Sequence, residues 1–571
     1  MNTYMIKVPD LSIVLGYFVV MLGIGIYFAR RMGNMHEYFG GGGRIPWWLS
    51  GISFYMTSFS AFAFVAYSQL AYKFGLAAIS VFWMSSVAAF LSATFFAAKW
   101  RRAARTSALE YVEQRFSLTL RQALAWINIP LRIIDNGLKL YAIGTLISGT
   151  LGLGTEYVLA SILFSGFVVF LYTFLGGLWA VMVTDFVQAV VMILAVIVLL
   201  PLSISQANGF SGIIKAAPEG FFNLTNDTFT FGYLVAWLVL VVFNYSSSWS
   251  LVQRYYSVPT DADARKVGYL VAGLQIITPP LLFLPAIAAR SFLPDLSSDQ
   301  VEQVYAIICR TLLPVGMIGL LISAMFAATM STLSGEYNAI ASVMTNDVYR
   351  RLISPHAKEK QLVFVGRITT VLVGMACLLV SMVLYYYPSG TSLFDMMVKV
   401  FSIFMPPIAI PMLAGLVSTR VSNRSALNGI ILGMIAGLGG YLLSLLNPHF
   451  EFLTKNQFMI PFTVGATFIG LILTEFIYRP SQEEQDRVRD FFSSMQAQAP
   501  AMPVGSGDGK FTFTPVQVIG ISVACLGLLM SSVMLFYMHE KNSLISLSVG
   551  VLMLAGGIIT FRLGKNKNKE E

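Results

Sequence analysis

The chain has 571 residues, of which 56% are hydrophobic and only 11% are charged. Soluble globular domains carry about 25% charged residues, so this composition excludes an ordinary soluble protein. The formal charge of +9 does not indicate a nucleic-acid partner, because the basic residues lie between apolar segments rather than on one face. We expect an all-α polytopic membrane protein whose surroundings are the lipid bilayer.

Fifteen apolar stretches are long enough to cross a bilayer as helices, which takes about 20 residues each. They lie at about 10–30, 46–71, 76–99, 122–150, 156–175, 178–202, 231–255, 267–289, 305–347, 362–386, 395–419, 425–446, 457–478, 512–537 and 543–562. The stretch at 305–347 is too long for one straight crossing, so we expect it to bend or to extend beyond the membrane. The segment 481–511 is expected to be an amphipathic piece followed by a linker.

The basic residues predict the orientation of these spans. If the N-terminus is outside, nearly all Lys and Arg fall in the loops inside, and positive residues are enriched on the inside of membrane proteins. Those inside segments are Arg30 to Arg44, Lys99 to Arg121, Arg254 to Lys266, Arg350 to Arg367, Arg420 to Arg424, Arg479 to Lys510 and Arg562 to Lys569. The pattern predicts an N-out, C-in protein of the plasma membrane, the inner membrane in a bacterium.

Two of the expected spans are interrupted by small polar residues. The second contains Ser53, Thr57, Ser58 and Ser60, and the seventh contains the run from Asn244 to Ser250. Unwound backbone at membrane depth is tolerated only where it lines a cavity, and paired interruptions in two halves of a chain point to a transporter's central site. Counted from the second span, these helices are first and sixth, which are corresponding positions in two five-helix repeats. Serine-mediated helix packing is the alternative for the seventh span.

One acidic residue, Asp185, lies in an otherwise apolar helix. Ionisable groups inside membranes are costly and usually functional, although a partner in the headgroup region is the alternative. The ninth span carries three hydroxyls within one turn, those of Ser331, Thr332 and Ser334. Hydroxyl and carbonyl oxygens are hard ligands that suit a small cation, whereas serine-rich helix packing is the other interpretation. Together with Asp185, the hydroxyls favour an ion site.

These segments resemble the sodium/solute symporter family, whose members have a LeuT-like core of two inverted five-helix repeats. The run from Gly176 to Gln188 is the most specific part, and the resemblance covers about residues 8–480. The other matching segments are Tyr38 to Arg44, Glu110 to Phe116, Val252 to Arg254, Ser331 to Tyr349, Phe394-Asp395 and Pro406-Pro407. The resemblance implies that core, one extra N-terminal helix and about four extra C-terminal helices.

The resemblance also implies a sodium site. In the family it uses two carbonyl oxygens of the broken first core helix, matched here by Met56 and Phe59. The eighth core helix supplies the rest, matched by the carbonyl of Ala328 and the hydroxyls of Ser331 and Thr332.

A second sodium is bound by some members. The matching residues for this ion, or for an ion relay, are Asp185, Ser331 and Ser334, with Gly335 at a position where those members have a hydroxyl. The resemblance therefore leaves one or two sodium ions per cycle open.

The solute pocket is less well matched. Positions that hold sugars in galactose- and glucose-type members correspond to Ala63, Phe82, Gln275 and Val398, of which only Gln275 can form hydrogen bonds. The arginine that takes the carboxylate in the sialic-acid member corresponds to Asp135. Arg132, Asp135 and Lys139 are spaced for pairing within one helix face, with direct solute contact as the alternative. The candidate pocket residues are Ser58, Ser60, Ala63, Phe64, Tyr67, Phe82, Asp135, Ser248, Trp249 and Gln275.

We therefore expect sodium-driven symport of a small organic solute, a sugar, sugar derivative or polyol, by alternating access, with a monomer as the working unit and Na⁺ as the only ion required. Proton coupling through Asp185 and uptake of an organic or amino acid are the alternatives. No catalytic motif predicts an enzyme. The expected units are 1–45 (extra helix), 46–204 and 205–422 (two repeats), 423–480 (peripheral helices), 481–511 (linker) and 512–571 (last helices and tail).

Overall fold

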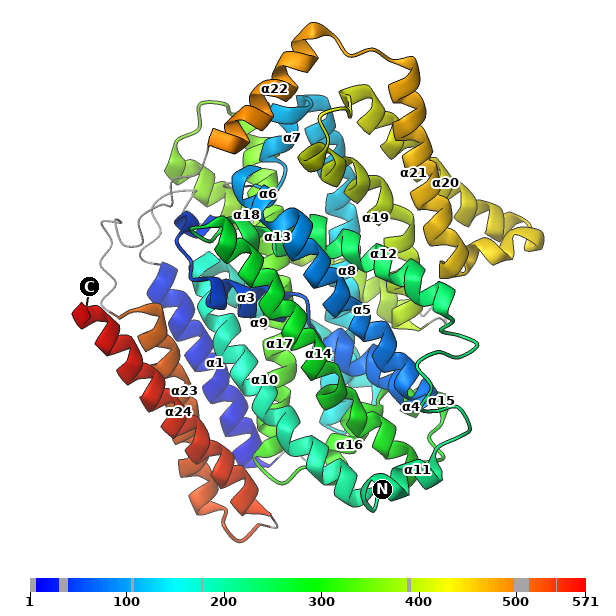
Figure 1. Ribbon diagram of the computed structural model, residues 1–571. Coiled ribbons are helices and arrows are strands. Elements are labelled where there is room, and N and C mark those ends of the chain that lie inside the picture. Colours follow the sequence, from blue (N-terminus) through cyan, green and yellow to red (C-terminus); the bar gives the residue numbers. More distant parts are fainter. Residues whose placement is uncertain are drawn as a thin grey trace.

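The computed structural model describes residues 7–29, 40–103, 107–175, 178–387, 392–497, 513–540 and 542–570. Within these ranges every regular element is a helix (Figure 1). The matching motif residues Tyr38 and Phe39 lie outside the described residues, as do Gly176 and Gly177 at the start of the Asp185 motif and residues 498–511 of the expected linker.

The helices follow one another along the chain with few long connections. Their bounds are α1 Val8–Ala29, η1 Gly41–Gly43, α3 Trp47–Thr57, η2 Ala63–Tyr67, α4 Ser68–Phe74, α5 Leu76–Ser92, η3 Ala93–Ala97, α6 Ala98–Ala103, α7 Glu110–Arg115, α8 Leu118–Thr150, η4 Thr155–Tyr157, α9 Val158–Leu175, α10 Leu178–Gln206, α11 Gly209–Ala216, α12 Phe231–Ser247, α13 Trp249–Tyr256, α14 Asp261–Phe292, α15 Ser298–Glu302, α16 Val304–Leu312, α17 Met317–Val343, η5 Met344–Ile353, α18 Glu359–Tyr386, α19 Leu393–Val417, α20 Asn423–Leu446, η6 Pro448–Thr454, α21 Asn456–Ile477, α22 Gln482–Ala497, α23 Pro515–Phe536 and α24 Ser543–Glu570.

Eleven helices of the described chain are long and apolar enough to cross a membrane, and the bent pair α12 and α13 makes a twelfth candidate. The other three expected spans coincide with helices that are not among these twelve candidates. The stretch at 46–71 is divided between α3, η2 and α4, 122–150 is the charge-bearing α8, and 156–175 contains α9, of which Val158–Phe170 counts as a shorter apolar helix.

Helix α17 forms the centre of the bundle. All 27 of its residues are buried, and its neighbours include α1, α3, α8, α10 and α18. Its first turn is capped by Asp10 of α1, whose Oδ1 accepts hydrogen bonds from the backbone N–H groups of Gly316 and Gly319, each at 2.8 Å. The expected span at 305–347 is thus two helices, α16 and α17, with Gly316 at a positive φ of 85° between them.

Both predicted interruptions are present. Helix α3 ends at Thr57, and helical structure resumes at Ala61, so Ser58 to Ser60 form a break. Ser248 separates α12 from α13, which meet at an angle of 54°. Each break contains serine residues, whose side chains compete for backbone hydrogen bonds.

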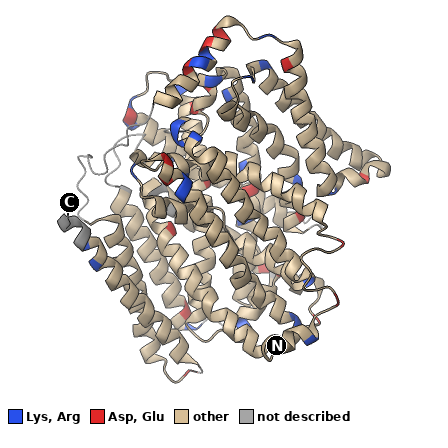
Figure 2. Ribbon diagram, in the orientation of Figure 1, with Lys and Arg blue, Asp and Glu red and all other residues tan. Residues whose placement is uncertain are grey.

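Charged residues gather at one end of the bundle, near α7 and α22 (Figure 2). Helix α22 lies across this end, with Glu484, Val488, Phe491 and Met495 buried on one face, and its other charged residues at least partly exposed. The first part of the segment expected to be an amphipathic piece and a linker is therefore a helix packed against the bundle. We refer to this part of the molecule as the α22 end.

Candidate functional site

The first break is held by α17. The Thr332 hydroxyl lies 2.5 Å from the carbonyl oxygen of Phe59, 3.1 Å from that of Ala328 and 3.4 Å from that of Met56. On the other side of the break, the N–H of Ala61 donates to Thr329 Oγ1 at 3.1 Å. The structure thus brings together four of the five oxygen atoms expected for the sodium site.

This oxygen cluster has more acceptors than donors. A threonine hydroxyl carries one proton, so it can satisfy only one of three surrounding carbonyls fully. The fifth expected ligand, the buried Ser331 hydroxyl, lies beside the Asp185 carboxyl but makes no well-formed hydrogen bond to a described residue. The carbonyl end of α3 adds the negative end of a helix dipole. The donor set therefore fits a small hard cation such as Na⁺.

Asp185 pairs with an arginine that the sequence analysis placed in a loop. Arg254 is fully buried in α13, and its Nη2 lies 3.6 Å from Asp185 Oδ2. Ser53 Oγ donates to the same carboxylate oxygen at 2.5 Å and accepts from Arg254 Nε at 3.1 Å. The expected inside segment therefore begins after Arg254. Arg254 lies inside the bundle because its guanidinium has a buried carboxylate and several buried oxygens as partners.

Gly335 makes room for this arginine. A Cβ atom at Gly335 would lie 3.1 Å from Arg254 Nη2 and 3.0 Å from Thr57 Cγ2. The other residue expected near a second ion, Ser334, donates to the backbone oxygen of Ser331 at 3.2 Å. At the position where a second sodium was considered, the described chain therefore has an arginine cation beside the aspartate.

A cavity of about 120 Å³ lies between the two breaks. Seven candidate pocket residues line it: Ser58, Ser60, Ala63, Tyr67, Phe82, Asp135 and Ser248. Aromatic rings form part of its wall, and those of Tyr67 and Phe82 meet edge to face with centroids 4.8 Å apart. The volume is below the 300–1,000 Å³ of typical drug-sized ligand sites, which suits a small solute.

Three candidates lie outside the cavity lining. Phe64 packs against Phe59 and Tyr305, with ring centroids 5.4 and 4.9 Å apart, and Trp249 is buried in α13. Gln275 stands behind the wall, where its Nε2 donates to Ser58 Oγ at 3.3 Å and to Tyr245 OH at 3.1 Å. Gln275 therefore holds two side chains that line the cavity.

Two acidic and two basic residues line the cavity. Lys139 pairs with Asp135 at 2.7 Å, as the spacing on one helix face predicts. Arg132 instead faces α17, where its Nη1 lies 3.7 Å from Glu336 Oε1. Sequence reasoning missed Glu336 because it stands at the end of a run of small residues, and its only sequence signal is that it is an acid in an otherwise uncharged helix.

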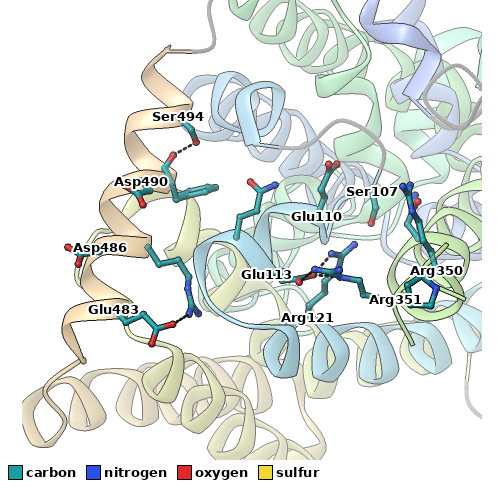
Figure 3. Close-up of a pocket in the computed structure, with 15 residues that line it drawn as sticks. Ser107, Glu110, Glu113, Arg121, Arg350, Arg351, Glu483, Asp486, Asp490 and Ser494 are labelled. Carbon is teal, nitrogen blue, oxygen red and sulfur yellow. Dashed lines mark hydrogen bonds and ion pairs between the residues drawn. The ribbon is translucent and has the colours of Figure 1, made fainter. Parts of the chain in front are cut away.

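A larger cavity of about 990 Å³ lies at the α22 end (Figure 3). Several of the charged residues around it pair with one another. Arg121 forms ion pairs with Glu113, at 2.6 Å, and with Asp347. Arg351 forms an ion pair with the other carboxylate oxygen of Glu113. Asp347 accepts a further hydrogen bond from Ser107 at 2.6 Å. This network joins α7, α8 and η5.

A cavity between two broken helices, deep in an all-helical bundle, is typical of secondary transporters. The family model described as "Sodium:solute symporter family" matches residues 38–433.

The curated relatives agree with that match. A sodium/glucose cotransporter of Vibrio parahaemolyticus is 28% identical over 460 residues, covering 74% of this chain and 83% of the relative. A sodium/sialic acid symporter of Proteus mirabilis is 26% identical over 455 residues, covering 77% and 90%. Sodium/glucose cotransporter 4 of Danio rerio is 26% identical over 480 residues, covering 76% and 72%.

Solved structures show the same fold. A substrate-bound, outward-open sodium-coupled sialic acid symporter superposes with a TM-score of 0.71 at 22% identity, over 83% of this chain and 99% of that one. A closed transporter of the nucleobase-cation-symport-1 family gives 0.51 at 13% identity, over 79% and 97%.

The chain belongs to the sodium:solute symporter family. It is an integral plasma-membrane protein that couples sodium to the symport of a small organic solute.

Proposed function

We propose that this protein carries one sodium ion together with a neutral sugar, sugar derivative or polyol, by alternating access. The observation that carries the proposal is the position of Thr332. Its hydroxyl reaches the carbonyl oxygens of Met56 and Phe59, and the same residue lines the solute cavity. An ion held by these oxygens would fix the first break, and thereby the wall that the solute contacts.

The proposed frame has fifteen spans, with the N-terminus outside and the α22 end in the cytoplasm. In it, 46–204 and 205–422 form two inverted five-helix repeats. The pairing of the breaks in α3–α4 and α12–α13 supports these repeats, since corresponding interrupted helices are typical of transporters built in this way. The same frame contains no role for a catalytic group, and we propose no enzymatic activity.

Charge balance in the cavity supports a neutral solute. Arg132 and Lys139 are opposed by Asp135 and Glu336, so the lining side chains carry no net charge. Hydroxyls of Ser58, Ser60 and Tyr245 and the amide of Asn244 add uncharged hydrogen-bonding groups. Aromatic walls with a few polar groups are common in small-molecule sites, and sodium/glucose cotransporters are among the relatives.

One sodium per cycle follows from the pairing of Asp185. A second ion ligated by this carboxylate would compete with a guanidinium already 3.6 Å away. Two cations at one buried acid repel each other strongly in a medium of low dielectric. We therefore assign the transported sodium to Met56, Phe59, Ala328, Ser331 and Thr332, and give Asp185 and Ser334 a supporting role.

Uptake of D-glucose, myo-inositol and sialic acid into proteoliposomes tests the proposal. We expect uptake of one of the neutral compounds to require sodium and to stop when choline replaces it. The variant Thr332→Val, which keeps the shape and removes the hydroxyl, should raise the half-saturating sodium concentration at least tenfold. Thr370→Val is the matched control, because among the described residues the hydroxyl of this buried threonine of α18 bonds only to the backbone oxygen of Gly366 in its own helix. Unchanged uptake in choline would overturn sodium coupling.

Proton coupling through Asp185 is the competing mechanism. It predicts that Asp185→Asn abolishes accumulation while Ser331→Ala with Thr332→Ala leaves it intact. The one-sodium mechanism predicts that the double hydroxyl variant is affected at least as strongly as Asp185→Asn. The arginine partner favours the second outcome, since a carboxylate that must stay charged to pair with Arg254 is poorly suited to release a proton in each cycle.

A further inference from the structure

Glu336 connects the proposed sodium site to the solute cavity. It lies four residues beyond Thr332 on α17, so the two side chains share one face of the helix. Its Oε1 accepts from Ser250 at 2.5 Å and from Ser248 at 3.4 Å, at the beginning of α13. Its Oε2 is buried and has no hydrogen-bond partner among the described residues.

Arg132, which faces it from α8, is also incompletely bonded. Its Nη1 and Nη2 lie 3.4 and 3.5 Å from Asn244 Oδ1, both long for a hydrogen bond, and its buried Nε has no partner in the described chain. Charge-assisted pairs between arginine and carboxylate are normally about 2.7–2.9 Å long. The separation of 3.7 Å from Glu336 therefore leaves bonding capacity on both groups.

The neighbouring pair in the same cavity shows the difference. Lys139 and Asp135 are separated by 2.7 Å on one helix, which is a closed ion pair. A pair that served only to hold α8 against α17 would be expected to close in the same way, because leaving buried charged atoms unsatisfied costs free energy. The Arg132–Glu336 pair is instead open, and both residues line the cavity.

We propose that Arg132 and Glu336 together bind two neighbouring hydroxyl groups of the transported solute. One solute hydroxyl donates to Glu336 Oε2, and the next accepts from the Arg132 guanidinium. The pair is neutral as a whole, so it takes an uncharged vicinal diol without requiring a counterion. This assignment rests on the proposed function. It places the solute contact at Glu336 on the same face of α17 as Thr332, which is a proposed sodium ligand.

The proposal can be separated from a purely structural role by neutralising both partners. Removing one member of a buried ion pair leaves the other charge uncompensated, whereas replacing both is often tolerated. The test therefore compares Arg132→Met, Glu336→Gln and the double variant in the full-length protein. Thermal unfolding reports folding and the sodium-induced shift, and titration with D-glucose, D-galactose and myo-inositol reports solute binding.

We expect the double variant to fold and to keep its sodium-induced shift, while the affinity for the sugar or polyol that the unchanged protein binds falls at least tenfold. A 2-deoxy sugar, which lacks one hydroxyl of a vicinal pair, should lose less affinity on mutation than its parent. Solute affinity in the double variant within twofold of the unchanged protein would overturn the assignment. Absence of any sodium effect in the unchanged protein would instead count against the proposed coupling, and the two failures are therefore distinguishable.

Discussion

Arg254 Nη2 lies 3.6 Å from Asp185 Oδ2, and neither side chain has any solvent exposure. The arginine is further fixed by donating to Thr57 Oγ1 at 2.9 Å and to the backbone oxygen of Ser250 at 2.8 Å. It thereby links α10 to both broken helices, α3 and α13. This buried pair therefore connects the helices that surround the proposed ion site.

Loss of the arginine alone should destabilise the protein strongly. Arg254→Met leaves the Asp185 carboxylate buried without its cation, and breaking a buried ion pair costs about 3–5 kcal/mol. Adding Asp185→Asn should recover most of the thermal stability because no uncompensated charge remains. The comparison is made by thermal unfolding in detergent, and equal stability of the single and double variants would contradict the pairing.

A methyl group at Gly335 should also be destabilising. It would lie 3.0 Å from Thr57 Cγ2 and 3.1 Å from Arg254 Nη2, and overpacking a filled interior costs about 1–3 kcal/mol. We expect Gly335→Ala to lower the melting temperature and to weaken sodium binding. Gly273→Ala in α14 is the control, since a Cβ there meets no described atom within 4 Å outside its own stretch of helix. A Gly335→Ala variant as stable as this control would show that the contact is not restrictive.

The start of α17 should depend on Asp10. Its carboxylate accepts from the N–H groups of Gly316 and Gly319, and losing such a cap costs about 0.5–2 kcal/mol. Asp10→Ala should lower the melting temperature, and Asp10→Asn, which keeps an acceptor oxygen, should lower it less. Hydrogen exchange at the N-terminal turn of α17 provides a local measurement, and unchanged exchange in Asp10→Ala would contradict the role.

The network at the α22 end should weaken in acid. Burial raises the pKa of Glu113, but its bonds to Arg351 and Arg121 outweigh this and hold the pKa below its ordinary value. A depressed carboxyl pKa contributes stability above the unfolded-state value of about 4.3, and this contribution is lost as the pH falls through the folded-state pKa. The melting temperatures of the unchanged protein and Glu113→Gln should differ at pH 7, and the difference should shrink as the pH is lowered through the folded-state pKa of Glu113. A constant difference would contradict the prediction.

The two broken helices could be predicted because their cause is local. Runs such as Ser58 to Ser60 contain small hydroxyl residues that compete with the helix for backbone bonds, and this is visible without a structure. The hydroxyls of Ser331 and Thr332 were found for the same reason, because their spacing alone places them in one turn. The carbonyl oxygens of Met56 and Phe59 were expected from the family resemblance and not from the residues alone, and the structure places them against Thr332 from a distant part of the chain.

Partners across the bundle could not be predicted. Arg254 looked like the first residue of an inside loop, because a basic residue at the end of an apolar stretch usually marks the membrane boundary. Its burial depends on Asp185, which lies 69 positions earlier in the chain, and no spacing rule joins residues so far apart. Glu336 was missed likewise, since its partners Arg132 and Ser250 come from two other helices.

Gly335 leaves room for Arg254 beside Asp185, and this arrangement has a consequence for the energetics of transport. In the proposed one-sodium mechanism a fixed arginine takes the place of a second mobile ion, so each neutral solute molecule would move with a single charge. A membrane potential of 100 mV then contributes about 2.3 kcal/mol per turnover, which corresponds to a concentrating power of about 50-fold before the sodium gradient is added. A carrier with two ions would square that ceiling but would draw twice the sodium current for each solute molecule.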